Sequence, residues 1–255
     1  CTLLNSVHKI SRENRRAIEY FMSEGGRFAF ASGRAPKNLV RFFDDITPNM
    51  PAICYNGAII HDYKTDETIY KKKLVPQVKE IAAKALKEIP EVGVVVDTEK
   101  EIYFLNHTEG INQFVEVVAN TPKYTEAENI KEDWLKLSFW IRPEKIGITE
   151  NFLESVDMPP ETWKLRTYSW AYEVLNSKSD KGTAISEYRK LYPGCRIFAV
   201  GDNENDIGML KNADIGFAMA NAQENTKKYA DVVLDSDYTQ SAMVEVVERI
   251  QKMIR

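Results

Sequence analysis

The sequence lacks any apolar run near the roughly 20 residues that a membrane-spanning helix needs, and its first residues show no signal-peptide pattern. A net charge of −4 gives no reason to expect a nucleic acid or an anionic membrane surface as a partner. The three cysteines, Cys1, Cys54 and Cys195, are widely spaced and form no CxxC or zinc-binding pattern. These absences predict a protein of the reducing cytoplasm with neither a nucleic-acid nor a membrane partner.

Motifs of several common enzyme classes are also missing. There is no Walker loop, no dinucleotide-binding G-x-G-x-x-G and no G-x-S-x-G nucleophile motif. The three histidines, His8, His61 and His107, have neither metal-binding nor triad spacing. Cys54 lies within an apolar run, which favours a small core residue over a nucleophile.

The most informative stretch runs from Ile197 to Asp206. Four apolar residues, too few for a helix, predict a buried parallel strand that ends at Gly201. Asp202 and Asp206 follow, with Asn205 between them, where open α/β sheets bind their ligands. Carboxylates there suit Mg²⁺, which takes one or two of them and keeps water or phosphate oxygens for the rest. Alternatively, Asp206 caps the next helix and Asp202 is a turn residue.

A calcium-binding loop at this stretch is excluded. If Asp202 took the first position, Ile207 would stand where the sharp turn needs glycine, and Ala213 where the bidentate glutamate belongs.

The order of predicted elements divides the 255 residues into two domains. Strands and helices alternate in residues 1–73 and 170–255, with the strand 173–175 in the second part. This pattern predicts one discontinuous domain with a doubly wound, Rossmann-like parallel sheet. Residues 74–169 contain more strands than helices and a tight hairpin. They predict an inserted α+β domain, an antiparallel sheet with helices on one face.

Polar groups follow three strands of the parallel domain. Ser32-Gly33-Arg34 ends the strand 27–31, Asn56-Gly57 ends the strand 52–55, and the two aspartates end the third. Since the ends of parallel strands meet at one edge, these groups should share a crevice. Lys181 lies in the first turn of a helix, where a cation is unfavourable unless an anion faces it, although a structural lysine is an alternative. Together these groups predict a phosphate site.

Six short motifs follow one another along the chain: Thr-Leu-Leu-Asn-Ser (2–6), Ala-Ser-Gly-Arg (31–34), Asn-Gly-Ala (56–58), Lys-Gly (181–182), Gly-Asp-Asn-Glu-Asn-Asp (201–206) and Gly-Phe-Ala-Met-Ala-Asn-Ala (216–222). In this order they resemble the motifs of the haloacid dehalogenase superfamily, and more closely those of the Cof-type phosphatases with the large α/β cap of subclass IIB. The resemblance covers the discontinuous domain from end to end, and the insert only in length and coarse pattern.

The resemblance implies Mg²⁺-dependent hydrolysis of small phosphorylated metabolites, such as sugar phosphates, through a phosphoaspartyl intermediate. The insert would be the cap that selects the substrate, and the oligomeric state stays open. The implied roles are as follows: Ser32 and Lys181 are catalytic; Gly33, Arg34, Asn56 and Asn205 bind phosphate or substrate; Asp202 and Asp206 hold the metal.

The sequence departs from the family pattern at its first residues. The family motif Asp-x-Asp-Gly-Thr-Leu supplies the nucleophile and a general acid/base, and Thr2-Leu3 align with its end. We therefore expect the nucleophilic aspartate upstream of Cys1. The alternatives are a pseudoenzyme that binds phosphometabolites without turnover, and Cys1 as a substitute nucleophile.

Overall fold

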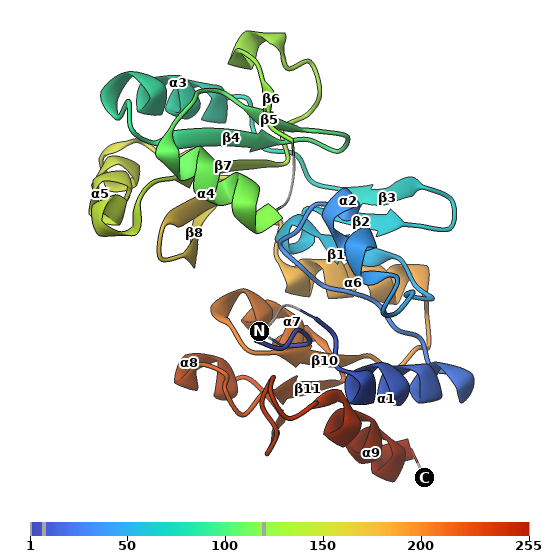
Figure 1. Cartoon of the computed structure of the whole chain (residues 1–255). Helices are drawn as coiled ribbons and strands as arrows, with labels where there is room; N and C mark the ends of the chain where they lie inside the picture. Colours follow the sequence, from blue (N-terminus) through green and yellow to red (C-terminus); the bar gives the residue numbers. More distant parts are fainter. Residues whose placement is uncertain (1, 7–8, 119–120, 255) are drawn as a thin grey trace. The chain divides into compact units, whose positions relative to one another are not determined.

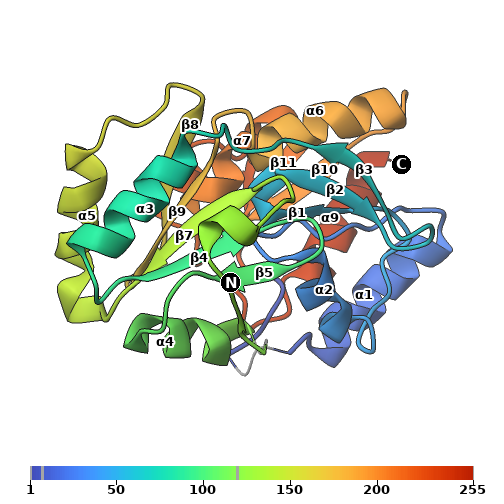
Figure 2. The same ribbon diagram turned by 90° about the horizontal axis from the view of Figure 1, so that it is seen from above.

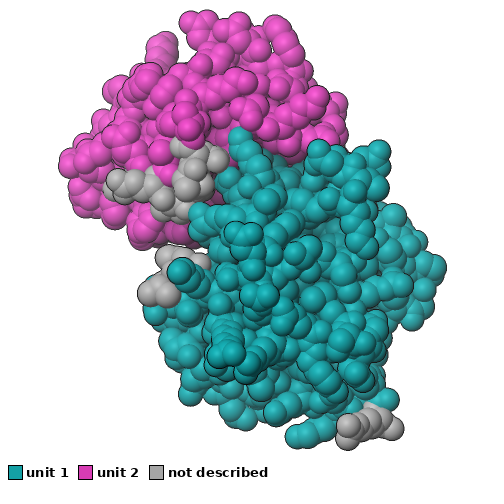
Figure 3. Space-filling model, turned by 45° about the vertical axis from the view of Figure 1, so that its right-hand side comes forward, with its two compact units in different colours: residues 1–70, 180–255 teal, residues 71–179 magenta. Residues whose placement is uncertain are grey.

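The computed structural model describes residues 2–6, 9–118 and 121–254, and it divides the chain into two compact units. Unit 1 comprises residues 1–70 and 180–255, and unit 2 comprises residues 71–179; Figure 3 shows them in teal and magenta. Over the described residues, no helix has both the length and the apolar character that crossing a bilayer requires. The chain therefore leaves unit 1 once and returns to it once.

The inserted unit extends beyond residues 74–169, the boundaries that the sequence suggested. The difference arises mainly from strand β9 (Ala171–Asn176), which pairs antiparallel with β7 (Lys136–Trp140) and β8 (Thr162–Tyr168). The assignment of 173–175 to the parallel domain was therefore wrong. A short apolar run shows that a strand is buried but does not show which sheet it joins.

Unit 2 is a six-stranded sheet in the order β6-β5-β4-β7-β9-β8. Helices α3 (Val78–Glu88) and α5 (Ile146–Ser155) cover one face, and their apolar residues form one core with the sheet. Helix α4 (Glu109–Val118) covers the other face (Figures 1 and 2). On that face Phe114 packs on Phe104 and Trp140. The expectation of helices on one face only was therefore wrong. Both faces of the sheet carry large apolar side chains, and helices on both faces keep them away from water. The remaining strands are β4 (Gly93–Asp97), β5 (Ile102–Phe104) and β6 (Lys123–Tyr124).

Unit 1 contains a parallel sheet of strands β10 (Phe198–Gly201), β11 (Ile215–Ala218) and β12 (Val232–Val233). A second sheet is antiparallel, with strands β1 (Ala52–Cys54), β2 (Ile59–Asp62) and β3 (Glu67–Lys71). The extended segment before Ser32 lies parallel to β1, since Ala31 and Ile53 form a bridge. The mixed α/β fold with a parallel-rich core, predicted from the alternation of elements, is confirmed.

Helices α6 (Lys181–Leu191) and α7 (Ile207–Asn212) pack against these strands and share a core with Ile53, Ile60 and Ala199. Helices α1 (Arg12–Ser23) and α9 (Met243–Ile254) lie side by side (Figure 1), and the buried Asn14 side chain accepts a hydrogen bond from the backbone N–H at the start of α9. The core that α6 and α7 share with the strands holds the start of α6 and the end of β10, which carry predicted site residues. The two remaining α-helices described in unit 1 are α2 (Pro36–Leu39) and α8 (Glu224–Lys227).

Candidate active site

The first part of the candidate site is the serine loop, Ser32–Arg34. The backbone N–H of Ser32 donates to the carbonyl of Ile53, which fixes the loop at the end of the segment paired with β1. The hydroxyl of Ser32 then accepts a 3.2 Å hydrogen bond from the backbone N–H of Arg34. The loop is thus a compact turn whose hydroxyl and N–H groups could bind an anion.

The second part is the left-handed turn, Tyr55–Gly57, which follows β1. Tyr55, Asn56 and Gly57 have φ values of 49°, 54° and 102°. This conformation costs about 1–2 kcal/mol for each residue with a side chain. Two hydrogen bonds hold it, because the N–H groups of Tyr55 and Asn56 donate to the carbonyls of Arg34 and Ser32. The turn is therefore attached directly to the serine loop.

Glycine is required at position 57 for two reasons. Its φ lies in the left-handed region, and a Cβ there would lie 2.2 Å from the carbonyl oxygen of Asp180. Asp180 is the N-cap of α6, and its carboxylate accepts hydrogen bonds from the N–H groups of Gly182 and Thr183. The left-handed turn therefore packs against the first residues of α6.

The third part is the acidic turn, Asp202–Asp206, which follows β10. One carboxylate oxygen of Asp206 accepts hydrogen bonds from the N–H groups of Asp202 and Asn203, at 2.9 and 3.1 Å. Gly201 makes this possible, since a Cβ there would lie 2.4 Å from the Cβ of Asp206. The carboxylate of Asp206 thus shapes the turn that presents Asp202.

Lys181 faces this turn from the first residue of α6. Its ammonium group donates a 2.6 Å hydrogen bond to the second carboxylate oxygen of Asp206, and both side chains are buried. Burial favours protonation of Asp206, but the Lys181 charge and the hydrogen bonds outweigh it, so the pKa of Asp206 is lowered. The sequence predicted an anion opposite this lysine, and the Asp206 carboxylate is one such anion.

Asp202 is the acidic residue best placed to hold a metal ion. It is 6 % exposed, and one of its carboxylate oxygens accepts a short hydrogen bond from the hydroxyl of Thr2. Both oxygens of Asp206 are already bonded to Lys181 and the backbone. Among the residues that the structure describes, no three His, Cys, Asp or Glu side chains form a metal-binding group. The site therefore offers Asp202 as one carboxylate ligand, which fits an ion that takes its other ligands from water and phosphate.

The structure brings most of the predicted residues together. The amide of Asn205 donates a 2.9 Å hydrogen bond to the side-chain oxygen of Asn56, which joins the acidic turn to the left-handed turn. The side chain of Arg34 makes a different contact: its guanidinium carbon lies over the ring of Phe42, 5.6 Å from the ring centre. The buried Cys54 is no candidate nucleophile, since burial raises the pKa of its thiol to about 12.

Sequence reasoning missed two features of the site. Thr2 was assigned no role of its own, although its hydroxyl contacts Asp202. The left-handed backbone at Tyr55 also had no signal in the sequence, because an aromatic residue rarely adopts it. The Asn-Gly pair that follows was the only local indication of a tight turn there.

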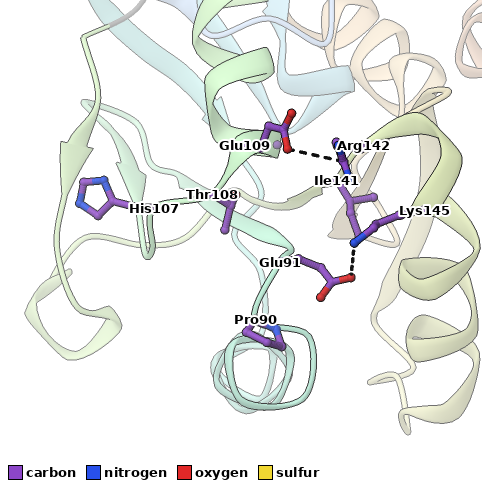
Figure 4. Close-up of a pocket in the computed structure, with 9 residues that line it drawn as sticks. Pro90, Glu91, His107, Thr108, Glu109, Ile141, Arg142 and Lys145 are labelled. Atoms are coloured by element: carbon purple, nitrogen blue, oxygen red, sulfur yellow. Dashed lines mark hydrogen bonds and ion pairs between the residues drawn. The ribbon is translucent and has the colours of Figure 1, made fainter.

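A pocket of about 300 Å³ lies in unit 2 (Figure 4). Its two cations have partners within the pocket: Arg142 contacts Glu109 at 3.5 Å, and Lys145 contacts Glu91 at 3.0 Å. All of the residues that line it belong to unit 2, whereas the predicted phosphate-binding and metal-binding residues belong to unit 1. This pocket is therefore not the predicted phosphate site.

The hydroxyl, the buried ammonium and the carboxylates of unit 1 are groups that suit binding of a phosphate, and comparison with known sequences identifies the family. Residues 1–246 match the pattern of the haloacid dehalogenase-like hydrolases, so the chain belongs to that family. The superfamily inferred from the ordered motifs is confirmed.

Relatives of known sequence carry phosphatase names. The chain is 25 % identical to the putative phosphatase YxeH of Bacillus subtilis, over 87 % of this chain and 84 % of that protein. It is also 25 % identical to the 5-amino-6-(5-phospho-D-ribitylamino)uracil phosphatase YitU of the same organism, over 90 % and 87 %. With the family match, these relatives identify the chain as a phosphatase.

Solved structures agree on the fold. TM0651 from Thermotoga maritima is 26 % identical and superposes with a TM-score of 0.79, over 97 % of this chain and 93 % of that one. BT4131, described as a subclass IIB sugar phosphatase, is 24 % identical and has a TM-score of 0.80 over 98 % and 95 %. At that identity the second likeness concerns the fold alone.

Proposed function

We propose that this phosphatase hydrolyses small phosphate monoesters with Mg²⁺, and that sugar or polyol phosphates are its first substrate class. The observation that carries the proposal is the convergence of three turns in unit 1. Hydrogen bonds join these turns to one another and to Lys181, and the turns carry the Ser32 hydroxyl and the Asp202 carboxylate. The name of YitU supports the substrate class, since it specifies a phosphate on a ribityl chain.

In this proposal Ser32 and Lys181 bind the transferring phosphoryl group. The Ser32 hydroxyl and the N–H of Gly33 donate hydrogen bonds to its non-bridging oxygens, while Lys181 neutralises the charge that develops on them. Asp206 keeps the Lys181 ammonium in place through their 2.6 Å hydrogen bond. Because both groups are buried, the position of the positive charge is set before the substrate binds.

Asp202 is the proposed Mg²⁺ ligand, and Thr2 orients its carboxylate through the hydroxyl. When bound, Mg²⁺ would neutralise phosphate charge and help to align the ester. Asp206 was predicted as a second metal residue, but its two oxygens hold Lys181 and the backbone of the acidic turn. We therefore assign it the positioning of Lys181 and Asp202.

The proposed chemistry has two steps. A carboxylate oxygen of the nucleophilic aspartate that the family motif supplies forms a bond to phosphorus while the ester P–O bond breaks. The leaving alkoxide takes a proton from a general acid. Water then hydrolyses the aspartyl phosphate, which releases phosphate and restores the carboxylate. Ser32 and Lys181 would bind the phosphoryl oxygens in both steps.

Phosphate release tests the proposal. The natural protein should release phosphate from p-nitrophenyl phosphate and from sugar phosphates when Mg²⁺ is present, and should lose this activity in EDTA. Binding of phosphate esters without any release across the panel would contradict the proposal and favour the non-catalytic binder. Full activity in EDTA would contradict the assignment of Asp202 to a metal.

A further inference from the structure

One hydrogen bond in unit 1 joins the two turns that follow strands of different sheets. The amide nitrogen of Asn205, in the acidic turn, donates to the side-chain oxygen of Asn56, in the left-handed turn, at 2.9 Å. The left-handed turn follows β1, and the acidic turn follows β10. Within the described residues these strands belong to two different three-stranded sheets, and the bond connects their two turns directly.

The backbone around Asn56 is held in an unfavourable conformation. Tyr55 and Asn56 both have positive φ, and both residues are only 1 % exposed. An aromatic residue at positive φ is a conformational outlier, and such outliers persist where the surrounding structure enforces them. Here the carbonyls of Ser32 and Arg34 enforce it through two backbone hydrogen bonds. The conformation aims the Asn56 side chain at the acidic turn.

The same side chain also contacts the serine loop. A Cβ built on Gly33 would lie 3.0 Å from both the nitrogen and the oxygen of the Asn56 amide. The Asn56 amide thus lies close to both Gly33 and Asn205. A shift of this amide would change the distance between the phosphate-binding serine loop and the turn that carries Asp202.

We propose that Asn56 and Asn205 form a positioning pair that fixes the serine loop relative to the acidic turn. Their role is exerted through each other, and they are not two independent contacts to the phosphate group. The inference rests on the proposed function, because it concerns the alignment of that same site. It predicts that once one of the two side chains is removed, removing the other has little further effect on catalysis.

A double-mutant cycle on the natural protein tests this inference. Asn56→Ala and Asn205→Ala should each lower kcat for p-nitrophenyl phosphate by up to about tenfold, the worth of one partly buried hydrogen bond, with little change in KM. The double variant should match the weaker single variant within about twofold, because coupled residues are not additive. Inhibition by inorganic phosphate should be nearly unchanged, since binding of the ground state does not need the alignment.

Independent contacts to phosphate give a different result. The two effects would then multiply, up to about a hundredfold, and the inhibition constant of phosphate would rise in each variant. That outcome overturns the inference and leaves the proposed function intact. Failure of the unmutated protein to hydrolyse any ester would instead remove the proposed function.

Two further variants separate catalysis from stability. Asn56→Gly lacks the amide but relieves the left-handed strain, so it should be more stable than Asn56→Ala and equally slow. Asn49→Ala is the matched control: its amide bonds Phe28 and Gly26 within unit 1, outside the site. It should lower Tm and leave kcat unchanged. If kcat followed Tm across all of these variants, the pair would be merely structural and the inference would be wrong.

Discussion

The buried Lys181–Asp206 pair gives the sharpest prediction for stability. Asp206→Asn keeps the size of the side chain but removes its charge, so the buried Lys181 ammonium loses its counter-ion. Breaking a buried ion pair by removing one partner costs about 3–5 kcal/mol. At roughly 2–4 °C per kcal/mol, Tm should fall by about 6–20 °C.

The loss should depend on pH in a defined direction. The pKa of Asp206 is lower in the folded chain than in the unfolded chain. Its contribution to stability is therefore complete above the unfolded value, about 4, and is lost as the pH falls through the folded value. The difference in unfolding free energy between the natural protein and Asp206→Asn should be largest above pH 5 and shrink in acid.

Calorimetry with fluorescence locates the effect in the chain. All four tryptophans lie in unit 2, so tryptophan fluorescence follows that unit, and the shift should appear in the calorimetric transition that fluorescence does not report. Asp214→Asn is the matched control, because Asp214 contacts Arg189 on the surface near the other end of β10. A loss below about 1 kcal/mol for Asp206→Asn, the worth of an exposed pair, would refute the reasoning.

Three more predictions follow from the same contacts. Lys181→Met should lower kcat by about 10²–10³, since it removes a preorganised cation; full activity with native circular dichroism would make Lys181 structural. Gly201→Ala should abolish activity and lower Tm because its Cβ would overlap Asp206, whereas Gly147→Ala, with open space around it in α5, should raise Tm slightly; equal effects would contradict the tight packing. Lys136→Met should destabilise unit 2 by about 3–5 kcal/mol, because it leaves two buried carboxylates without their lysine; an unshifted tryptophan transition would argue against this.

Local patterns predicted the parts of the fold that depend on neighbouring residues. An apolar run that stops at a glycine predicted that β10 ends at Gly201, and therefore that Asp202 and Asp206 lie just beyond the end of the strand. The membership of β9 in the inserted sheet could not be predicted, because pairing is decided by residues far away in the sequence. The same holds for α4, whose stripe of apolar residues does not specify which face of the sheet it covers.

The candidate site shows the same division. The rule that parallel strand ends meet at one edge predicted that Ser32, Asn56 and Asp202 lie close together. Hydrogen bonds do join their turns, although β1 and β10 belong to different sheets within the described residues. The ion pair between Lys181 and Asp206 could not be predicted, because a separation of 25 residues in the sequence does not show which side chains are in contact. The roles of Asp206 and Asn205 thus required the geometry, which shows a carboxylate with both oxygens bonded and an amide bonded to Asn56.

The central claim is that the acidic turn supplies the metal ligand of a phosphatase site. The most direct test measures phosphate release from p-nitrophenyl phosphate over a range of Mg²⁺ concentrations, for the natural protein and for Asp202→Ala. Asp214→Ala is the control, an aspartate of the same unit outside the site. We expect Mg²⁺-dependent release by the natural protein and by Asp214→Ala, and almost none by a folded Asp202→Ala. Unchanged Mg²⁺-dependent release by Asp202→Ala would contradict the account.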